Sequence, residues 1–323
     1  MPVGRGNTPG VPELPQPEVE IPQLRVIEPV GEYEPTWIAP DGTVLPLNPP
    51  GQDFFTLKTV AGLGAIPIDI VTSPSPEGGV IIEFTRVRER AITWPIRFRE
   101  DTHMKFLPLW RNTIDLFTQT RRLGPGLLRI RRPDGEEREI RAVYQSGLEL
   151  DANAGGAWIE DTAVISLMCP DPYWRPVDPI RFEQRQEASG SFTNPFPNIG
   201  SGAVLGHAVI PNPGVADVWP EWRVYGPMTA LTATHNVTGR SFTLTHTLAA
   251  GRYLTISSRP MRVRLDDGTN LIDKLNLPTG KPWGLPAKST SDITFAVTGA
   301  AVPVGGVRGT GIELTFKPGF ETA

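Results

Sequence analysis

The chain has one cysteine, Cys169, among its 323 residues. A single cysteine excludes an intrachain disulfide framework and any zinc site built from several cysteines. No apolar run approaches the ~18 residues that would cross a bilayer, and the first twenty residues lack the apolar stretch of a secretory signal peptide. We therefore expect neither a disulfide-stapled fold nor insertion into a membrane.

Motifs of catalysis and cofactor binding are also missing. The sequence has no G-x-S-x-G elbow, no phosphate-binding P-loop and no complete G-x-G-x-x-G. Its four histidines show neither H-E-x-x-H nor another metal-ligand spacing. Pairs of acids for glycoside hydrolysis could be drawn at will from 35 Asp and Glu residues, so their number decides nothing. We expect no catalytic residues, no metal and no cofactor.

Glycine and proline are abundant instead. The chain has 33 glycines and 35 prolines, 68 of 323 residues together, a level below that of wholesale disorder. So many turn-forming residues predict short elements and few helices, which favours a mainly β protein. The net charge of −4 leaves no overall positive charge for nucleic acid or an anionic membrane.

The first 36 residues differ in composition from the rest. Spaced prolines favour extended backbone there, and the segment is too polar to form a core of its own. Two interpretations stay open, a disordered tail or an arm that lies along a neighbouring subunit.

Residues 37–174 predict a β domain with one helix. Alternation of apolar and polar residues over 80–98 indicates a pair of strands, and a Pro-Asp-Gly turn near 134 indicates a β-hairpin. A helix is expected at about 102–122, ending before Gly124. Its apolar face would present Leu107, Trp110, Ile114 and Phe117.

The stretch Ser166–Pro179 surrounds the cysteine with aromatic residues and prolines. Cys169 follows Ile165 and Leu167 at strand parity, so we expect an inert thiol that faces the core and not a nucleophile. The prolines after it end regular structure, which predicts a linker over 175–182 between two domains.

Residues 183–323 predict an antiparallel β-sandwich, because short strands alternate with turns at regular spacing. Three tryptophans in this half, Trp219, Trp222 and Trp283, are candidates for contact with a carbohydrate or a protein partner. Exposed aromatic patches are uncommon, so closure of the sandwich edges is the favoured role for them.

The middle of the chain is basic. Residues 86–141 hold fourteen Lys and Arg against eight Asp and Glu. Arg86, Arg88 and Arg90 recur at strand parity and are candidates for lining a channel through which a polyanion passes. A solvated face with salt bridges is the favoured alternative.

Several stretches, in this order, resemble one protein family. They are "GLLRIRRPDGEEREIRAVYQSGLEL", "CPDPYW", "VWPEWRVYGP", "RLDDGTN", "PWGLP" and "GIELTFKPGFETA", with the helix "FLPLWRNTIDLFTQT" before the first. The order is similar to that of the distal tail proteins, or minor tail proteins, of long non-contractile-tailed bacteriophages. The resemblance covers about residues 37–323.

The resemblance implies a structural virion protein of the tail tip, made in the host cytoplasm. It implies a homo-hexameric ring that joins the tail-tube protein to the baseplate hub, with DNA passing through its channel. It also implies an N-terminal ring-forming domain and a galectin-like sandwich at the C-terminus, without catalytic residues. A carbohydrate-binding module that contacts a host surface glycan is the alternative, and an enzyme of the cell wall is a second rival.

Overall fold

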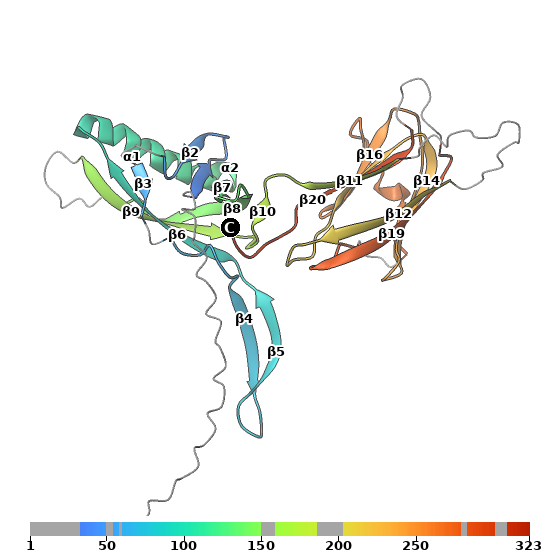
Figure 1. Cartoon of the computed structure of the whole chain (residues 1–323), viewed down its shortest axis with the longest axis horizontal. Coiled ribbons are helices and arrows are strands. Elements are labelled where there is room, and N and C mark those ends of the chain that lie inside the picture. Colours follow the sequence, from blue (N-terminus) through green and yellow to red (C-terminus); the bar gives the residue numbers. More distant parts are fainter. Residues whose placement is uncertain are drawn as a thin grey trace, which may run out of the picture. The chain divides into compact units, whose positions relative to one another are not determined.

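The computed structural model describes residues 33–49, 54–57, 60–149, 159–185, 203–278, 283–300 and 309–323. The expected proline-rich arm, residues 1–36, lies almost entirely outside the described residues. The fold is mainly β with one long helix, as predicted (Figure 1).

The first half of the chain forms an antiparallel sheet whose strands differ in length. Its strand order is β2-β1-β7-β8-β9-β6-β3, with β10 paired to β8. The strands are β1 (Glu34–Ile38), β2 (Val44–Pro46), β3 (Phe54–Thr56), β6 (Arg90–Arg99), β7 (Gly126–Arg131), β8 (Glu137–Ser146), β9 (Glu160–Cys169) and β10 (Arg175–Pro176). The hairpin predicted around the Pro-Asp-Gly turn is β7–β8, which turns at Arg132–Glu136.

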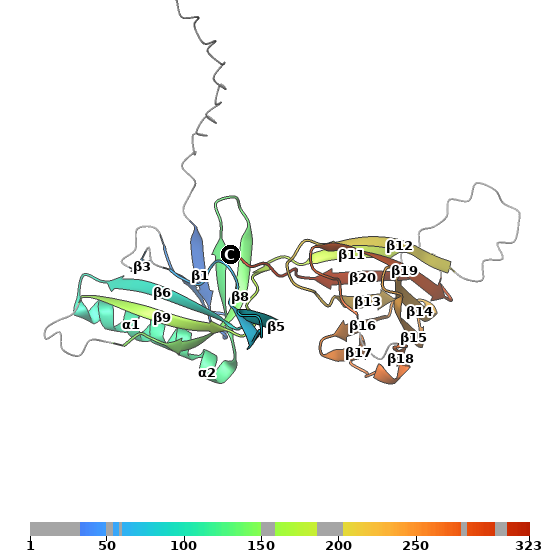
Figure 2. The same cartoon turned by 90° about the horizontal axis from the view of Figure 1, so that it is seen from below.

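Helix α1 (His103–Thr118) lies along this sheet, followed by the short α2 (Thr120–Leu123) (Figure 2). Trp37 of β1 holds the two layers together, because its indole N–H donates to the Leu116 carbonyl at 3.1 Å and its ring stacks on Phe117 at 4.7 Å. The buried helix residues are Phe106, Thr113, Leu116 and Phe117. The expected face is thus rotated, since Trp110 and Ile114 are only partly buried.

Strands β4 (Ile68–Pro74) and β5 (Val80–Val87) form a separate two-stranded sheet. The sequence pattern over 80–98 did predict two strands, but the expected pairing between them is wrong. β6 pairs instead with β9 and β3. Figure 1 shows β4 and β5 as a ribbon that extends away from the sheet.

The second half forms an antiparallel sandwich of two five-stranded sheets, with strand orders β11-β20-β13-β16-β17 and β12-β19-β14-β15-β18. The strands of the first sheet are β11 (Ile180–Arg185), β13 (Glu221–Tyr225), β16 (Tyr253–Ser258), β17 (Met261–Leu265) and β20 (Gly311–Phe316). Those of the second are β12 (Ala203–Asn212), β14 (Met228–His235), β15 (Arg240–Leu248), β18 (Leu275–Asn276), which follows the 3-10 turn η1 (Ile272–Lys274), and β19 (Ser289–Thr298).

The chain passes between the first sheet and the sandwich twice. It leaves through β10 and β11, and it returns after β20, which is paired with β11 over the whole length of that strand. The returning segment, 317–323, then lies on the first sheet. Trp174 and Phe320 exchange backbone hydrogen bonds of 2.9 and 2.8 Å, and Arg138 donates to the Thr322 carbonyl at 2.7 Å. The sequence predicted one linker, over 175–182, and gave no sign of the second passage.

We predict that Phe320→Ala weakens the attachment of the returning segment. Phe320 packs against the hydrophobic core of the first sheet, and the Arg138 guanidinium lies 4.1 Å from the ring centre of Phe320. Losing this partly buried ring should lower the free energy of unfolding by about 1–3 kcal/mol, measured by urea titration. The control is Glu321→Ala, which keeps the backbone carbonyl that Arg90 uses and should change stability by less than ~0.5 kcal/mol. Equal effects of the two substitutions would contradict the prediction.

Candidate interaction sites

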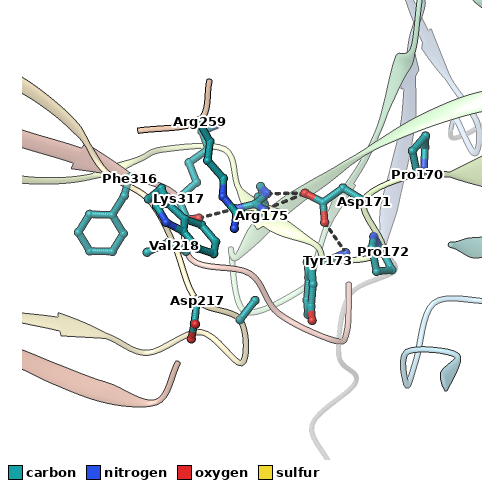
Figure 3. Close-up of a pocket in the computed structure, with 12 residues that line it drawn as sticks. Pro170, Asp171, Pro172, Tyr173, Arg175, Asp217, Val218, Arg259, Phe316 and Lys317 are labelled. Carbon is teal, nitrogen blue, oxygen red and sulfur yellow. Dashed lines mark hydrogen bonds and ion pairs between the residues drawn. The ribbon is translucent and has the colours of Figure 1, made fainter. Parts of the chain in front are cut away.

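A hollow of about 440 Å³ lies beside the proline-rich segment 170–176, which we call the seam. Its walls come from the segment after β9, the approach to β13, the turn after β16 and the end of β20 (Figure 3). It is lined by Pro170, Asp171, Pro172, Tyr173, Arg175, Ala216, Asp217, Val218, Trp219, Arg259, Phe316 and Lys317.

Most charges of this hollow are already neutralised. The Arg175 guanidinium donates to the Asp171 carboxylate at 2.8 Å and to the Lys317 carbonyl at 2.8 Å. The Lys317 ammonium in turn donates to the Glu139 carboxylate at 2.8 Å. These pairs connect the seam to β8 and β20. The charged side chains that line the hollow therefore have a structural role.

The hollow offers no activated nucleophile. Burial, reinforced by the nearby Asp171 carboxylate, raises the pKa of Tyr173, so its hydroxyl stays protonated near neutrality. Asp171 is held by Arg175 and by the Tyr173 backbone N–H. Among the described residues, no group of three or more His, Cys, Asp or Glu side chains is placed to hold a metal ion.

Cys169 is completely buried at the end of β9. Burial raises the pKa of its thiol to about 12, and the nearby Arg90 cation offsets this only in part. Strand parity predicted this burial, which is confirmed. Because the thiolate is the reactive form, we expect the thiol to be unreactive in the folded protein.

Arg90 does not line a surface. Its side chain is 1% exposed, and its N–H groups donate to four backbone carbonyls. These carbonyls belong to Pro172 (2.8 Å), Gly62 (2.6 Å), Gly64 (2.8 Å) and Glu321 (2.8 Å). Burial lowers the pKa of this guanidinium, although arginine remains charged at any ordinary pH. The expectation that Arg90 lines a channel is therefore corrected: it holds three chain segments together.

Arg86 and Arg88 are exposed but paired. Arg86 bonds to Asp69 across the β4–β5 ribbon at 2.9 Å, and Arg88 contacts Asp69 at 3.4 Å and Glu89 at 3.2 Å. Over residues 68–89 these two arginines face four carboxylates, those of Asp69, Glu77, Glu83 and Glu89. The ribbon therefore has more acidic than basic side chains, which does not favour contact with a polyanion. The other lysines and arginines of residues 86–141 lie outside the ribbon.

The three candidate tryptophans separate into two groups. Trp222 and Trp283 are 1% and 4% exposed and meet edge to face at 5.1 Å in the sandwich core. The expectation that Trp222 and Trp283 contact a glycan or a partner is therefore wrong, because both pack inside the core. Trp219 is half-buried at the hollow, and the Arg259 guanidinium lies 3.3 Å from its ring centre.

A feature that sequence reasoning missed is the apolar surface of the β4–β5 ribbon. Directly paired residues point to the same side of a hairpin, and both sides carry exposed apolar residues. Ile68, Ile70, Val80, Ile82 and Val87 lie on one side, and Ile81 and Phe84 on the other. The consecutive apolar residues Val80, Ile81 and Ile82 were the available signal, since a strand with one wet face should alternate.

Comparison with known proteins identifies the architecture. No protein-family model and no curated protein sequence matches the chain. Among solved structures, the SPP1 Dit protein covers 89% of this chain and 99% of its own length, with a TM-score of 0.60 and 12% identity. The protein has the Dit fold.

Two further matches come from the phage P2 baseplate in its activated conformation, with calcium and with strontium. They have TM-scores of 0.53 and 0.52 and identities of 8% and 9%, and each covers 91% of this chain and all of the other. SPP1 Dit is described as a paradigm of the hub adsorption apparatus in phages that infect Gram-positive bacteria. The resemblance to distal tail proteins is thus confirmed at the level of fold.

We predict that Cys169→Ser leaves the fold intact but lowers the free energy of unfolding by about 1–2 kcal/mol, because a hydroxyl replaces a thiol in an apolar site. In the native protein at pH 8, Cys169 should react with iodoacetamide many times more slowly than in urea, because the raised pKa keeps the thiol protonated. Rapid alkylation of the folded chain would contradict the burial of this residue.

Arg90→Met should lower the free energy of unfolding by about 3 kcal/mol or more, because four carbonyls, one buried and three partly buried, lose their donor. Arg88→Met is the matched control two residues away, with an exposed side chain, and should cost less than ~0.5 kcal/mol. Chemical denaturation of both variants measures the difference. Similar stabilities for the two would refute the assigned role of Arg90.

Proposed function

We propose that this protein is a structural component of a bacteriophage tail tip and has no enzymatic activity. In this proposal it forms a homo-hexameric ring that joins the tail-tube protein to the baseplate hub and leaves a central channel for DNA. The observation that carries the proposal is the match to SPP1 Dit along nearly the whole of both chains. Baseplate chains of phage P2 with the same fold support it.

The β4–β5 ribbon supplies a physical reason for assembly. An isolated two-stranded hairpin is marginal in water, and this one exposes apolar side chains on both sides. Ile70 and Ile82 are 52% and 60% exposed, and burying such a side chain is worth about 1.5–3 kcal/mol. A second copy of the chain would cover the ribbon, and cyclic symmetry would repeat this contact around a closed ring.

The two halves of the chain take different parts in this proposal. Residues 37–174 form the ring, and residues 183–323 form a sandwich that faces outward. The hollow beside the seam agrees with a structural role, because its charged groups mainly tie the seam to β8 and β20.

Ile70→Ser with Ile82→Ser should abolish the ring without unfolding the chain, because both side chains are exposed within a single chain. Native mass spectrometry and negative-stain imaging should find hexamers of the wild type and monomers of the variant, with similar thermal unfolding. Val237→Ser, at a side chain 75% exposed in the sandwich, is the control and should keep the ring. A wild type that stays monomeric at high concentration, even beside its tail-tube protein, would contradict the proposal.

A further inference from the structure

The outer face of one sandwich sheet carries a row of arginines between aromatic side chains. β13 and β16 alternate between buried and solvent-facing positions. The solvent-facing positions of β13 are Glu221, Arg223 and Tyr225, and those of β16 are Tyr253, Thr255 and Ser257. Arg262 and Arg264 of the edge strand β17 pair with Ser257 and Thr255, so they point to the same side.

Cross-strand register places these side chains next to one another. Arg223, Thr255 and Arg264 lie in one row across β13, β16 and β17, and Glu221, Ser257 and Arg262 lie in the next. Arg259, in the turn after β16, lies over Trp219. We call Arg223, Arg259, Arg262 and Arg264 the arginine strip. The aromatic residues that flank the strip, Trp219 and Tyr225, are ~20 Å apart along the chain, at ~3.3 Å per residue.

The charge of the strip is only partly balanced by nearby acids. Within the described part of the chain, none of its four arginines forms an ion pair. Two carboxylates lie in its rows across β20, β13, β16 and β17, namely Glu221 and Glu313, which is paired directly with Arg223. The neighbouring Arg252 shows the contrast, because it pairs with Asp266 and Asp267 at 2.5 and 2.7 Å. Arg262 and Arg264 lie two residues apart on the edge strand β17, on the same side of the sheet, so their like charges are close together in a chain whose net charge is −4. Such a local conflict is typical of a binding surface.

Aromatic rings orient two of these cations. The Arg259 guanidinium lies 3.3 Å from the Trp219 ring centre, and that of Arg223 lies 5.1 Å from the Tyr253 ring centre. A guanidinium that stacks on a ring keeps its N–H groups free along its edge, where they can donate to an acid. The rings therefore position donors ahead of any ligand, which lowers the entropy lost on binding.

We propose that the arginine strip binds an anionic polysaccharide. The strip offers spaced cations for the acidic groups of such a polymer. The hydroxyl groups of Tyr253, Thr255 and Ser257 lie between them and can bond to sugar hydroxyls. Arginine, tryptophan and tyrosine also dominate protein interfaces; the hydroxyl groups between the cations are what favours a sugar polymer over a protein partner.

Duplex DNA also fits less well. Four arginines neutralise at most ~4 phosphates, whereas proteins that bind duplexes commonly contact about 6–10. The strip also lies on the face of a five-stranded sheet, which offers no helix or ribbon to enter a groove. This inference goes beyond the proposed ring, since it assigns a ligand to the sandwich and does not depend on assembly.

The test is titration calorimetry of the full chain with polygalacturonate, with neutral dextran of similar length and with a 20-bp DNA duplex as comparisons. We expect polygalacturonate to bind, more weakly at high salt, and dextran not to bind. Arg262→Glu with Arg264→Glu should weaken binding at least tenfold, because both side chains are exposed and reversal makes them repel the polymer.

The matched control is Arg240→Glu, which reverses an exposed arginine on β15 of the other sheet and should leave the affinity within twofold of wild type. Thermal unfolding of all variants should coincide. Three outcomes would overturn the inference: no binding of polygalacturonate, equal binding by the double variant, or tighter binding of duplex DNA. If polygalacturonate does not bind, Arg262 and Arg264 would instead protect the edge strand β17 from aggregation.

Discussion

The first half of the structure depends on one buried cation. Arg90 stands where the β4–β5 ribbon meets β6, and its guanidinium satisfies carbonyls from the loop after β3, from the proline-rich seam and from the returning C-terminal segment. A buried charge costs several kcal/mol unless hydrogen bonds compensate it. The segments must therefore converge on Arg90 together, which couples the base of the ribbon to the seam.

This coupling explains why the seam is rich in proline and still well packed. Pro170, Pro172 and Pro176 cannot donate backbone hydrogen bonds, so side chains tie this segment down instead. Arg90 and Arg175 perform that task from either side, and Trp174 bonds to Phe320. Two passages of the chain, paired as β11 and β20, then connect the sheet with the sandwich. A double connection restrains relative motion more than one flexible linker would.

Two surfaces have no partner among the described residues, and they differ in chemistry. The ribbon is apolar on both sides, which suits a second copy of the chain. The arginine strip is cationic and hydroxyl-rich, which suits an acidic polymer. Their separation, one on β4–β5 and one on β13–β17, would let assembly and ligand binding proceed without competing for the same residues.

Features that depend on local pattern could be predicted from the sequence. The Pro-Asp-Gly turn predicted β7–β8, helical spacing predicted the region of α1, and parity placed Cys169 inside, because turn geometry and side-chain period act over a few residues. The candidate sites depended on more distant contacts. Arg90 shares the strand parity of Arg86 and Arg88, yet it is buried because four carbonyls from remote segments meet it.

Trp219 and Trp222 stand three residues apart on an extended segment, so they point to opposite sides, but only the packing of two sheets decided which side became the core. The same holds for Val80, Ile82 and Phe84. Their alternation predicted a strand, and tertiary structure decided that no other layer of the described residues covers it. Burial depends on the contacts that a strand makes and not on its own pattern.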